Sequence, residues 1–254
     1  MKVLVTGAVH GLGRAFLEHA IARGNTVVAV DRDAAGLAEL EHHYPREVTA
    51  REVDLADEEG VRKLTADMAR FFRFDMALLN AGISATGPFE SIPFEASVRL
   101  VRVNVSAPLV MASGLVGGGA MNKRSTLVFV SSLSHAVGYP GAAAYAASKD
   151  AVSAYAEAVR RPFRKRGVRV TTVYPGPLRT LHAERHAPPG ARAEGRMAPE
   201  VAARKIWRAA RKGERYLHPG LAAKTAGSLG RLMPATATRL MRKVIYEKLD
   251  ESVW

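Results

Sequence analysis

Apolar and polar positions alternate along the first 180 residues in a way that predicts strands and helices in strict succession. Short apolar runs end in glycine or polar residues and predict buried strands, whereas apolar positions spaced three or four apart predict helices. The predicted strands are 3–5, 26–30, 47–53, 77–79, 126–130 and 168–173, with a seventh at Tyr216-Leu217. The predicted helices are 14–22, 34–43, 58–72, 94–112, 144–163 and 199–212.

Strands that alternate with helices through short links form a parallel sheet with helices on both faces. We therefore expect an α/β fold with a single doubly wound domain over residues 1–254. In such a fold ligands bind at the carboxyl ends of the strands. The residues that follow the predicted strands are thus the first candidates for a site.

The first predicted strand ends in Thr6 and is followed by Gly7-x-x-x-Gly11-x-Gly13, which opens a helix. Glycines in a strand–turn–helix context let backbone N–H groups and the helix N-terminus approach a pyrophosphate. The spacing differs from the G-x-G-x-x-G of many dinucleotide folds, and a plain glycine-rich turn remains the alternative. Asp54, Asn80, Ser132 and the Pro175-Gly176 turn also fall at predicted strand ends.

Asp31 closes the second strand about 20 residues beyond the glycine loop, where an acidic residue can accept hydrogen bonds from an adenosine ribose. Its charge would repel a 2′-phosphate, and this favours NAD. Arg32 follows at once and could attract that phosphate, so NADP remains the alternative.

Tyr145 and Lys149 are spaced i, i+4, which places both side chains on one face of the predicted helix. A free tyrosine has a pKa of about 10, and a nearby ammonium favours the phenolate. A serine hydroxyl beside the phenol, such as that of Ser132, could hold a carbonyl or alkoxide oxygen. The three residue types suit proton transfer to or from an alcohol oxygen, although a Tyr-x-x-x-Lys pair taken alone is usually structural.

Taken together, these motifs resemble the short-chain dehydrogenase/reductase family in its form of about 250 residues. The resemblance covers residues 1 to about 180 and implies a seven-stranded parallel sheet in the order 3-2-1-4-5-6-7. It implies an NAD(P)-dependent oxidoreductase that interconverts a secondary alcohol and a ketone. The implied catalytic residues are Asn104, Ser132, Tyr145 and Lys149, with Tyr145 as general acid/base, its pKa lowered by Lys149.

The resemblance also implies the cofactor contacts. These are Gly7, His10, Gly11, Leu12, Gly13, Asp31, Arg32, Asp54, Leu55, Asn80, Ala81, Gly82, Tyr145, Lys149, Pro175, Gly176 and Thr180. His135 and Tyr139 are candidates for substrate contacts, and no histidine spacing indicates a metal site. Leu79 stands where the family often has a second asparagine. A dinucleotide-binding sensor or scaffold without catalysis is the competing hypothesis.

Charge is distributed unevenly. Residues 1–159 hold 15 basic and 17 acidic residues, whereas residues 160–254 hold 22 and 7. Residues 181–199 predict a loop, and the region 181–215 resembles a substrate lid. Residues 221–249 predict a basic amphipathic extension that could lie on an anionic membrane, cover a core edge or contact a subunit. The charge does not indicate nucleic acid, because no recognisable nucleic-acid module is present.

Several further expectations follow. The chain has no cysteine, which excludes thiol chemistry. The uncharged run 103–122 is long enough to span a membrane, but its glycines, Pro108 and Asn104 favour a buried helix. The first residues do not resemble a signal peptide.

We expect a cytoplasmic protein, with membrane association as an option. We also expect it to form a homodimer or homotetramer and to act on a small alcohol or ketone, hydrophobic or acidic in character.

Overall fold

The computed structural model describes residues 1–254 except 136–138, 188–194, 221–233, 245 and 249–251. Seven parallel strands form one sheet in the order β3-β2-β1-β4-β5-β6-β7, which confirms the predicted fold class and strand order. The strands are β1 (Lys2–Thr6), β2 (Thr26–Asp31), β3 (Val48–Glu52), β4 (Phe74–Leu79), β5 (Met121–Val130), β6 (Arg169–Val173) and β7 (Tyr216–Leu217).

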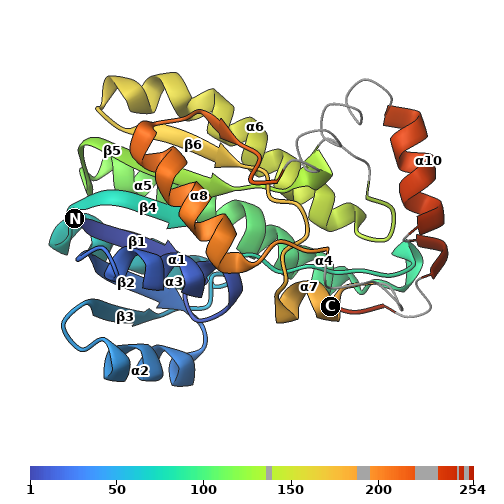
Figure 1. The fold of residues 1–254 in the computed structure, drawn as a ribbon, viewed down its shortest axis with the longest axis horizontal. Coiled ribbons are helices and arrows are strands. Elements are labelled where there is room, and N and C mark those ends of the chain that lie inside the picture. The colour runs from blue at the N-terminus through green and yellow to red at the C-terminus, as the bar shows by residue number, and fades with distance from the viewer. Residues whose placement is uncertain (136–138, 188–194, 221–233, 245, 249–251) are drawn as a thin grey trace.

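Helices cover both faces of this sheet (Figure 1). They are α1 (Gly11–Ile21), α2 (Ala34–His43), α3 (Glu58–Phe71), α4 (Phe94–Val101), α5 (Ala107–Gly117), α6 (Ala143–Lys165), α7 (Leu181–Arg185), α8 (Pro199–Lys212) and α10 (Pro234–Val244). Short 3₁₀ turns lie at Phe89–Ser91, Leu133–His135 and Tyr246–Lys248. Local signals fix several helix ends: the Asp33 side chain caps α2, and Gly213, at φ 72°, ends α8.

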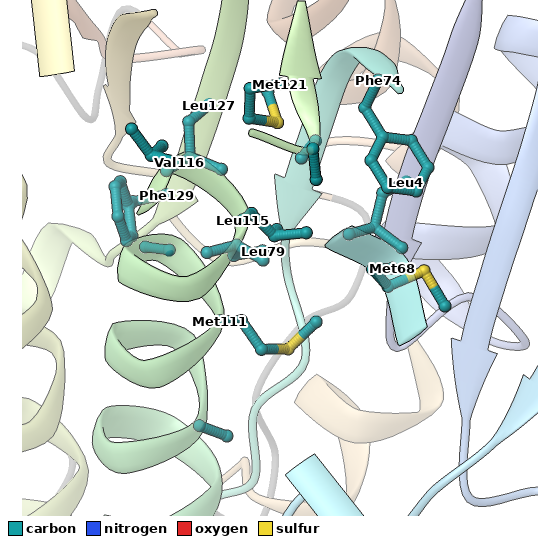
Figure 2. Close-up of a cluster of buried hydrophobic side chains, with 14 of the residues drawn as sticks. Leu4, Met68, Phe74, Leu79, Met111, Leu115, Val116, Met121, Leu127 and Phe129 are labelled. Atoms are coloured by element: carbon teal, nitrogen blue, oxygen red, sulfur yellow. The ribbon is translucent and has the colours of Figure 1, made fainter. Parts of the chain in front are cut away.

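The strands are apolar on both sides because each sheet face is covered by helices. Leu4 and Leu79 point to one face, where they pack with α3, α5 and α6 (Figure 2). Val3 and Val5 point to the opposite face, where α1, α2 and α8 complete a second core. The central strands are therefore held rigidly from both sides, and their carboxyl ends form a fixed edge.

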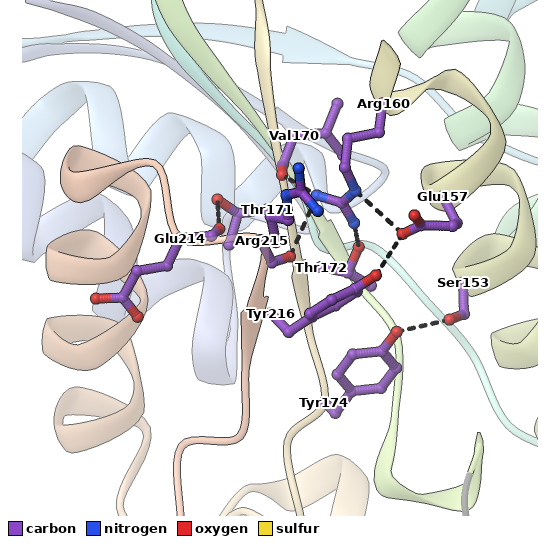
Figure 3. A network of polar contacts seen from close by, with 10 residues as sticks. All are labelled: Ser153, Glu157, Arg160, Val170, Thr171, Thr172, Tyr174, Glu214, Arg215 and Tyr216. Carbon is purple, nitrogen blue, oxygen red and sulfur yellow. Dashed lines mark hydrogen bonds and ion pairs between the residues drawn. The ribbon is translucent and has the colours of Figure 1, made fainter. Parts of the chain in front are cut away.

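A polar network joins α6 to β6 and to the edge strand β7 (Figure 3). The buried Arg160 of α6 donates to the carbonyl oxygen of Val170 and to Thr172 Oγ1 in β6. Arg160 also binds Glu157, which accepts a hydrogen bond of 2.6 Å from the hydroxyl of Tyr216 in β7. Because buried charges need such partners, this network fixes the position of α6 against β6 and β7.

The predicted helix 94–112 forms and extends to Gly117, but its hydrogen bonding changes part-way along. A π-helical turn, Arg102–Ser106, separates α4 from α5 and carries Asn104 into the protein. Pro108 lies four residues beyond Asn104 and has no N–H to donate to its carbonyl, so regular α-helical hydrogen bonding cannot pass this point. The change of helix type therefore has a cause that is visible in the sequence.

The region expected to form a lid divides into two parts. Helix α7 lies beside the carboxyl edge of the sheet, whereas α8 packs against α1 with Ala202, Ala203 and Ile206 fully buried. Of the predicted basic extension 221–249, residues 221–233, 245 and 249 lie outside the described part. Within α10 the side chains of Arg239, Arg242 and Lys243 are exposed.

One stretch of the described residues, Phe94–Gly117, is long and apolar enough to meet a membrane-span criterion based on length and composition. Half of its most apolar window is buried in the fold. It includes α5, whose Met111, Ala112 and Leu115 have no exposed surface. The buried side of α5 therefore packs in the core of the domain, whereas Phe94 and Val101 of α4 are exposed.

Candidate active site

A cavity of about 1010 Å³ opens along the carboxyl ends of the strands. It brings together most of the residues that the sequence singled out: Gly7, His10, Gly11, Leu12, Asp31, Arg32, Asp54, Leu55, Asn80, Ala81, Gly82, Ser132, Tyr139, Tyr145, Lys149, Pro175, Gly176 and Thr180. Gly13 and Asn104 do not line the cavity. The side chain of His135 lies outside the described part of the structure, so its predicted substrate contact remains a prediction.

The glycine loop forms one wall of the cavity. Gly7 and Gly11 adopt positive φ angles of 65° and 53°, which favour glycine. Gly13 lies so close to the loop that a Cβ atom there would sit 1.8 Å from the carbonyl oxygen of Gly7. At Gly11 a Cβ atom would meet the Thr180 methyl group at 3.1 Å, so the loop reaches the segment after β6. This tight packing holds the backbone at the N-terminus of α1 against the cavity.

Asn80 fastens the glycine loop to the end of β4. Its side-chain nitrogen donates to the carbonyl oxygens of Thr6 and Gly7, at 3.1 and 3.2 Å. The Thr6 hydroxyl oxygen in turn accepts from the backbone N–H groups of Asn80 and Ala81, at 3.0 and 3.1 Å. Asn80 therefore shapes the cavity wall through the loop.

Two carboxylates mark the end of the cavity near β2 and β3. Asp31 accepts hydrogen bonds from the backbone N–H groups of Val9, Arg32 and Asp33, at 3.0, 2.8 and 3.2 Å. Asp54 pairs with Arg99 at 2.7 Å. Partial burial alone would raise the pKa of Asp54, but the N–H of Ala56 and the Arg99 charge outweigh it, and the pKa is lowered.

Tyr145, Ser132 and Lys149 line the cavity together. The side chains of Tyr145 and Ser132 are joined by a hydrogen bond. Lys149 is buried, its Nζ atom lies 5.7 Å from the centroid of the Tyr145 ring, and this ammonium donates to the carbonyl oxygen of Val130 at 3.0 Å. The i, i+4 spacing thus places both residues on one face of α6, as predicted.

The predicted direction of the tyrosine pKa shift is wrong for this structure. Burial raises the pKa of Tyr145, and the hydrogen bond with Ser132 only partly offsets this. Lys149 makes its hydrogen bond to Val130, and burial lowers the pKa of this lysine to about 8. The i, i+4 spacing therefore predicted correctly that Tyr145 and Lys149 share a helix face. It did not predict whether folding raises or lowers the pKa of the tyrosine.

Asn104 does not line the cavity but is hydrogen-bonded to the segments that carry the cavity residues. Its Oδ1 atom accepts from the N–H of Ile83 at 2.8 Å, while Nδ2 donates to the Ile83 carbonyl at 2.9 Å and to Ser148 Oγ at 3.0 Å. The Ser148 hydroxyl donates to the carbonyl of Tyr145 at 2.7 Å. Asn104 therefore links the segment after β4 to the helical turn that carries the tyrosine.

The family comparison agrees with this geometry. Residues 1–189 match the family model described as short chain dehydrogenase. The chain belongs to this family. Among the described residues of this short-chain dehydrogenase, no group of three or more histidine or acidic side chains could hold a metal ion.

Relatives of this short-chain dehydrogenase include proteins of larger size. An uncharacterised short-chain type dehydrogenase/reductase from Sinorhizobium fredii is 33% identical over 183 residues, which are 70% of this chain and 32% of that protein. The chain therefore spans about a third of the length of this relative.

Two solved structures are similar over nearly the whole chain. A short-chain dehydrogenase from Streptomyces avermitilis is 29% identical with a TM-score of 0.78, and 91% of each chain is covered. A short-chain dehydrogenase from Burkholderia cenocepacia in complex with NADP is 25% identical with a TM-score of 0.75, covering 90% of this chain and 92% of that one. Family and fold together support an NAD(P)-dependent oxidoreductase.

The segment after β6 lies in the region 181–215 that resembles a substrate lid, and it adds cavity residues that the sequence analysis did not name individually. His182, Arg185 and His186 of the α7 region line the cavity, as do Thr86 and Arg196. The His186 ring contacts the Thr86 hydroxyl at 3.1 Å, and the backbone of Thr86 pairs with that of Val253. His182 keeps an exposed surface, but the protein atoms packed around its ring, followed by the nearby His186, Lys149 and Arg185, lower its pKa. These contacts join segments far apart in the chain, and no local pattern marks them.

Proposed function

We propose that this short-chain dehydrogenase interconverts a secondary alcohol and the corresponding ketone, with Tyr145 as the residue that exchanges the proton. The observation that carries the proposal is the shared cavity: the hydrogen-bonded Ser132–Tyr145 pair and Lys149 line the same space as the glycine loop. A proton-transferring phenol and a phosphate-binding loop in one cavity suit a reaction that moves a proton and a hydride together.

The chain's own residues divide the chemistry between them. The Ser132 hydroxyl orients the substrate oxygen, and the Tyr145 phenol gives its proton to a ketone oxygen or removes one from an alcohol. Because burial raises its pKa, Tyr145 holds its proton at neutral pH, which favours donation to a ketone. Asn104 and Ser148 fix the turn that carries the phenol and so hold its position.

A nicotinamide dinucleotide, when bound, supplies or accepts the hydride. The glycine loop fits its pyrophosphate because the close packing at Gly13 leaves backbone at the cavity wall. At the far end, Asp31 favours a ribose with a free 2′-hydroxyl, so we propose NAD as the preferred cofactor. Arg32 and Arg99 also line this end and are the groups that would favour NADP. Parallel titration with NADH and NADPH decides between them.

The test is Tyr145→Phe, assayed with a panel of ketones and alcohols at the reduced-nicotinamide absorbance band. The variant should lose about a hundredfold to ten-thousandfold in kcat, because proton transfer contributes on the order of 10²–10⁴. Its affinity for the cofactor, followed by nicotinamide fluorescence, should stay close to that of the wild type. Tyr155→Phe is the matched control, since Tyr155 lies on the same helix but binds the carbonyl of Leu109.

Undiminished turnover in Tyr145→Phe would refute the role of the phenol. The competing hypothesis, a sensor or scaffold that binds a dinucleotide without catalysis, predicts a different result. In that case the wild-type protein would bind NADH or NADPH but turn over no substrate in the panel.

A further inference from the structure

The cavity is asymmetric in charge. Its two lining carboxylates, Asp31 and Asp54, lie at the end near β2 and β3. Another part of the cavity lining comes from residues 181–187 and 195–196, which we call the lid wall. The ionisable residues of the lid wall that line the cavity are all basic or imidazole: His182, Arg185, His186 and Arg196. No described acidic residue of the lid wall lines the cavity.

The backbone around Arg196 is anchored. Met197 forms a parallel bridge with Leu178, its carbonyl accepts from the N–H of Arg179 at 2.9 Å, and its own N–H donates to Pro177 at 3.3 Å. Arg196 therefore enters the cavity from a segment that is hydrogen-bonded to the loop after β6. Its position is fixed relative to Pro175 and Gly176, which line the same cavity.

Arg196 lies close to the proposed chemistry. Its charge influences the pKa of Tyr139, and Tyr139 is in turn close enough to Tyr145 to influence the pKa of the phenol. Burial raises the pKa of Tyr139, with Arg196 acting in the opposite direction. The guanidinium therefore acts electrostatically on Tyr139 and belongs to a residue that lines the same cavity as Tyr145.

Two polar groups of residues that line the cavity lack partners among the described residues. The Nη1 atom of Arg196 and the hydroxyl of Ser134 are buried without a hydrogen bond, and both residues line the cavity. No described carboxylate forms an ion pair with Arg196. Buried polar groups without partners are rare and destabilising, particularly when they carry charge. A ligand with anionic oxygen atoms would supply what both groups lack.

We propose that the lid wall recognises a carboxylate on the substrate, with Arg196 as the main specificity-determining residue. The inference rests on the proposed alcohol–ketone activity and names its substrate class: oxo acids and the corresponding hydroxy acids. A guanidinium presents its N–H groups in a planar fork that matches a carboxylate, and a lysine cannot reproduce this geometry. Arg185 adds positive charge, while Ser134 offers a hydroxyl.

The histidines of the lid wall have a different role. Because the pKa values of His182 and His186 are both lowered, the two rings are neutral at pH 7. The His186 ring is already in contact with Thr86. They therefore shape the wall without adding charge, and the attraction for an anion comes from the arginines.

The experiment compares each oxo acid with its own methyl ester. Suitable probes are 4-oxopentanoate and 6-oxoheptanoate with their methyl esters, which vary the distance between the ketone and the charge. We expect the wild-type enzyme to prefer an acid over its ester by about tenfold or more in kcat/KM, since hydrogen bonds to charged groups are worth roughly ten- to a hundredfold. Equal use of acids and esters would refute the carboxylate site and leave the alcohol–ketone activity intact.

Three variants locate the effect. Arg196→Met should raise KM for the acids about tenfold or more while the esters and the cofactor keep their values. Arg196→Lys should retain part of the preference because the charge remains. Arg179→Met is the matched control: Arg179 is exposed and does not line the cavity, so its loss of charge should leave the preference unchanged.

Other results would contradict either the carboxylate recognition by Arg196 or the alcohol–ketone activity, and the two cases can be told apart. A parallel loss of acid and ester turnover in Arg196→Met would show a structural role and overturn the specificity assignment. An equal loss of preference in Arg179→Met would show that overall charge, and not Arg196, attracts the acids. If the wild-type protein reduces neither acids nor esters with NADH or NADPH, nor any other ketone, the proposed function itself fails.

Discussion

Replacing Lys149 with methionine removes a buried ammonium group that has no carboxylate partner in the described part of the chain. The lysine is 5% exposed, and its hydrogen bond to the Val130 carbonyl is the contact that holds it. Burial lowers the pKa of Lys149 from 10.5 to about 8. Between these two values the folded protein binds fewer protons than the unfolded chain, so stability rises with pH across this window.

The lowered pKa of Lys149 determines how strongly the free energy of unfolding depends on pH. At pH 7 the buried charge costs about 3 kcal/mol, and by pH 10 this cost falls to roughly 1 kcal/mol as the lysine loses its proton in both states. The Lys149→Met variant does not bear the cost of the buried charge. It does leave the Val130 carbonyl without a hydrogen-bond donor, which costs about 1–3 kcal/mol at any pH. We therefore expect the two proteins to differ little at pH 7, and the wild type to gain about 2.5 kcal/mol on the variant by pH 10.

Urea unfolding of both proteins at pH 7, 8, 9 and 10, without cofactor, measures this difference. Other tyrosines and lysines titrate in both proteins and cancel in the comparison. Lys63→Met, at an exposed position on α3, is the control and should follow the wild type within about 0.5 kcal/mol at every pH. A constant difference between wild type and Lys149→Met from pH 7 to 10 would show that the lysine is not desolvated as the structure indicates.

Three further substitutions test the positions that support the site. Asn104→Ala removes three hydrogen bonds of 2.8–3.0 Å and should lower the free energy of unfolding by about 3 kcal/mol in urea titrations. Gly13→Ala places a Cβ atom 1.8 Å from the Gly7 carbonyl oxygen and should weaken NADH binding at least about tenfold in fluorescence titrations, whereas Gly117→Ala, with open space around it, should not. Asp31→Ser should shift the ratio of NADH to NADPH affinity toward NADPH by about tenfold, and an unchanged ratio would remove Asp31 as the discriminating residue.

The strands and most helices were predictable because each is marked locally. Short apolar runs became buried strands, and some helix ends carry capping residues, such as Asp33 and Gly213. The strand order came from the family resemblance, since apolar runs alone do not specify which strands pair. The π-helical turn at Asn104 was missed, although Pro108 removes the N–H donor that regular α-helical hydrogen bonding would need there.

Site residues that directly follow strands could be predicted from the sequence. Site residues that lie on loops could not. Asp31 and Asn80 follow strands, so the parallel sheet brings them to one edge. Arg196 and His182 reach the cavity through a segment that has no periodic pattern, and their partners are set by tertiary contacts. Ser148 was also missed, because its link between Asn104 and the Tyr145 turn depends on how two helices pack.

The Tyr145–Lys149 pair shows why a motif determines placement but not protonation. The spacing on α6 fixes which face both residues share, whereas their pKa values depend on the solvent that folding removes. Burial acts on the two groups in opposite directions, raising the pKa of the phenol and lowering that of the ammonium. A phenol in this state is a better proton donor than acceptor at neutral pH. Under the proposed mechanism, abstraction of a proton from an alcohol would require the phenolate to be stabilised more strongly than the Ser132 hydrogen bond achieves here.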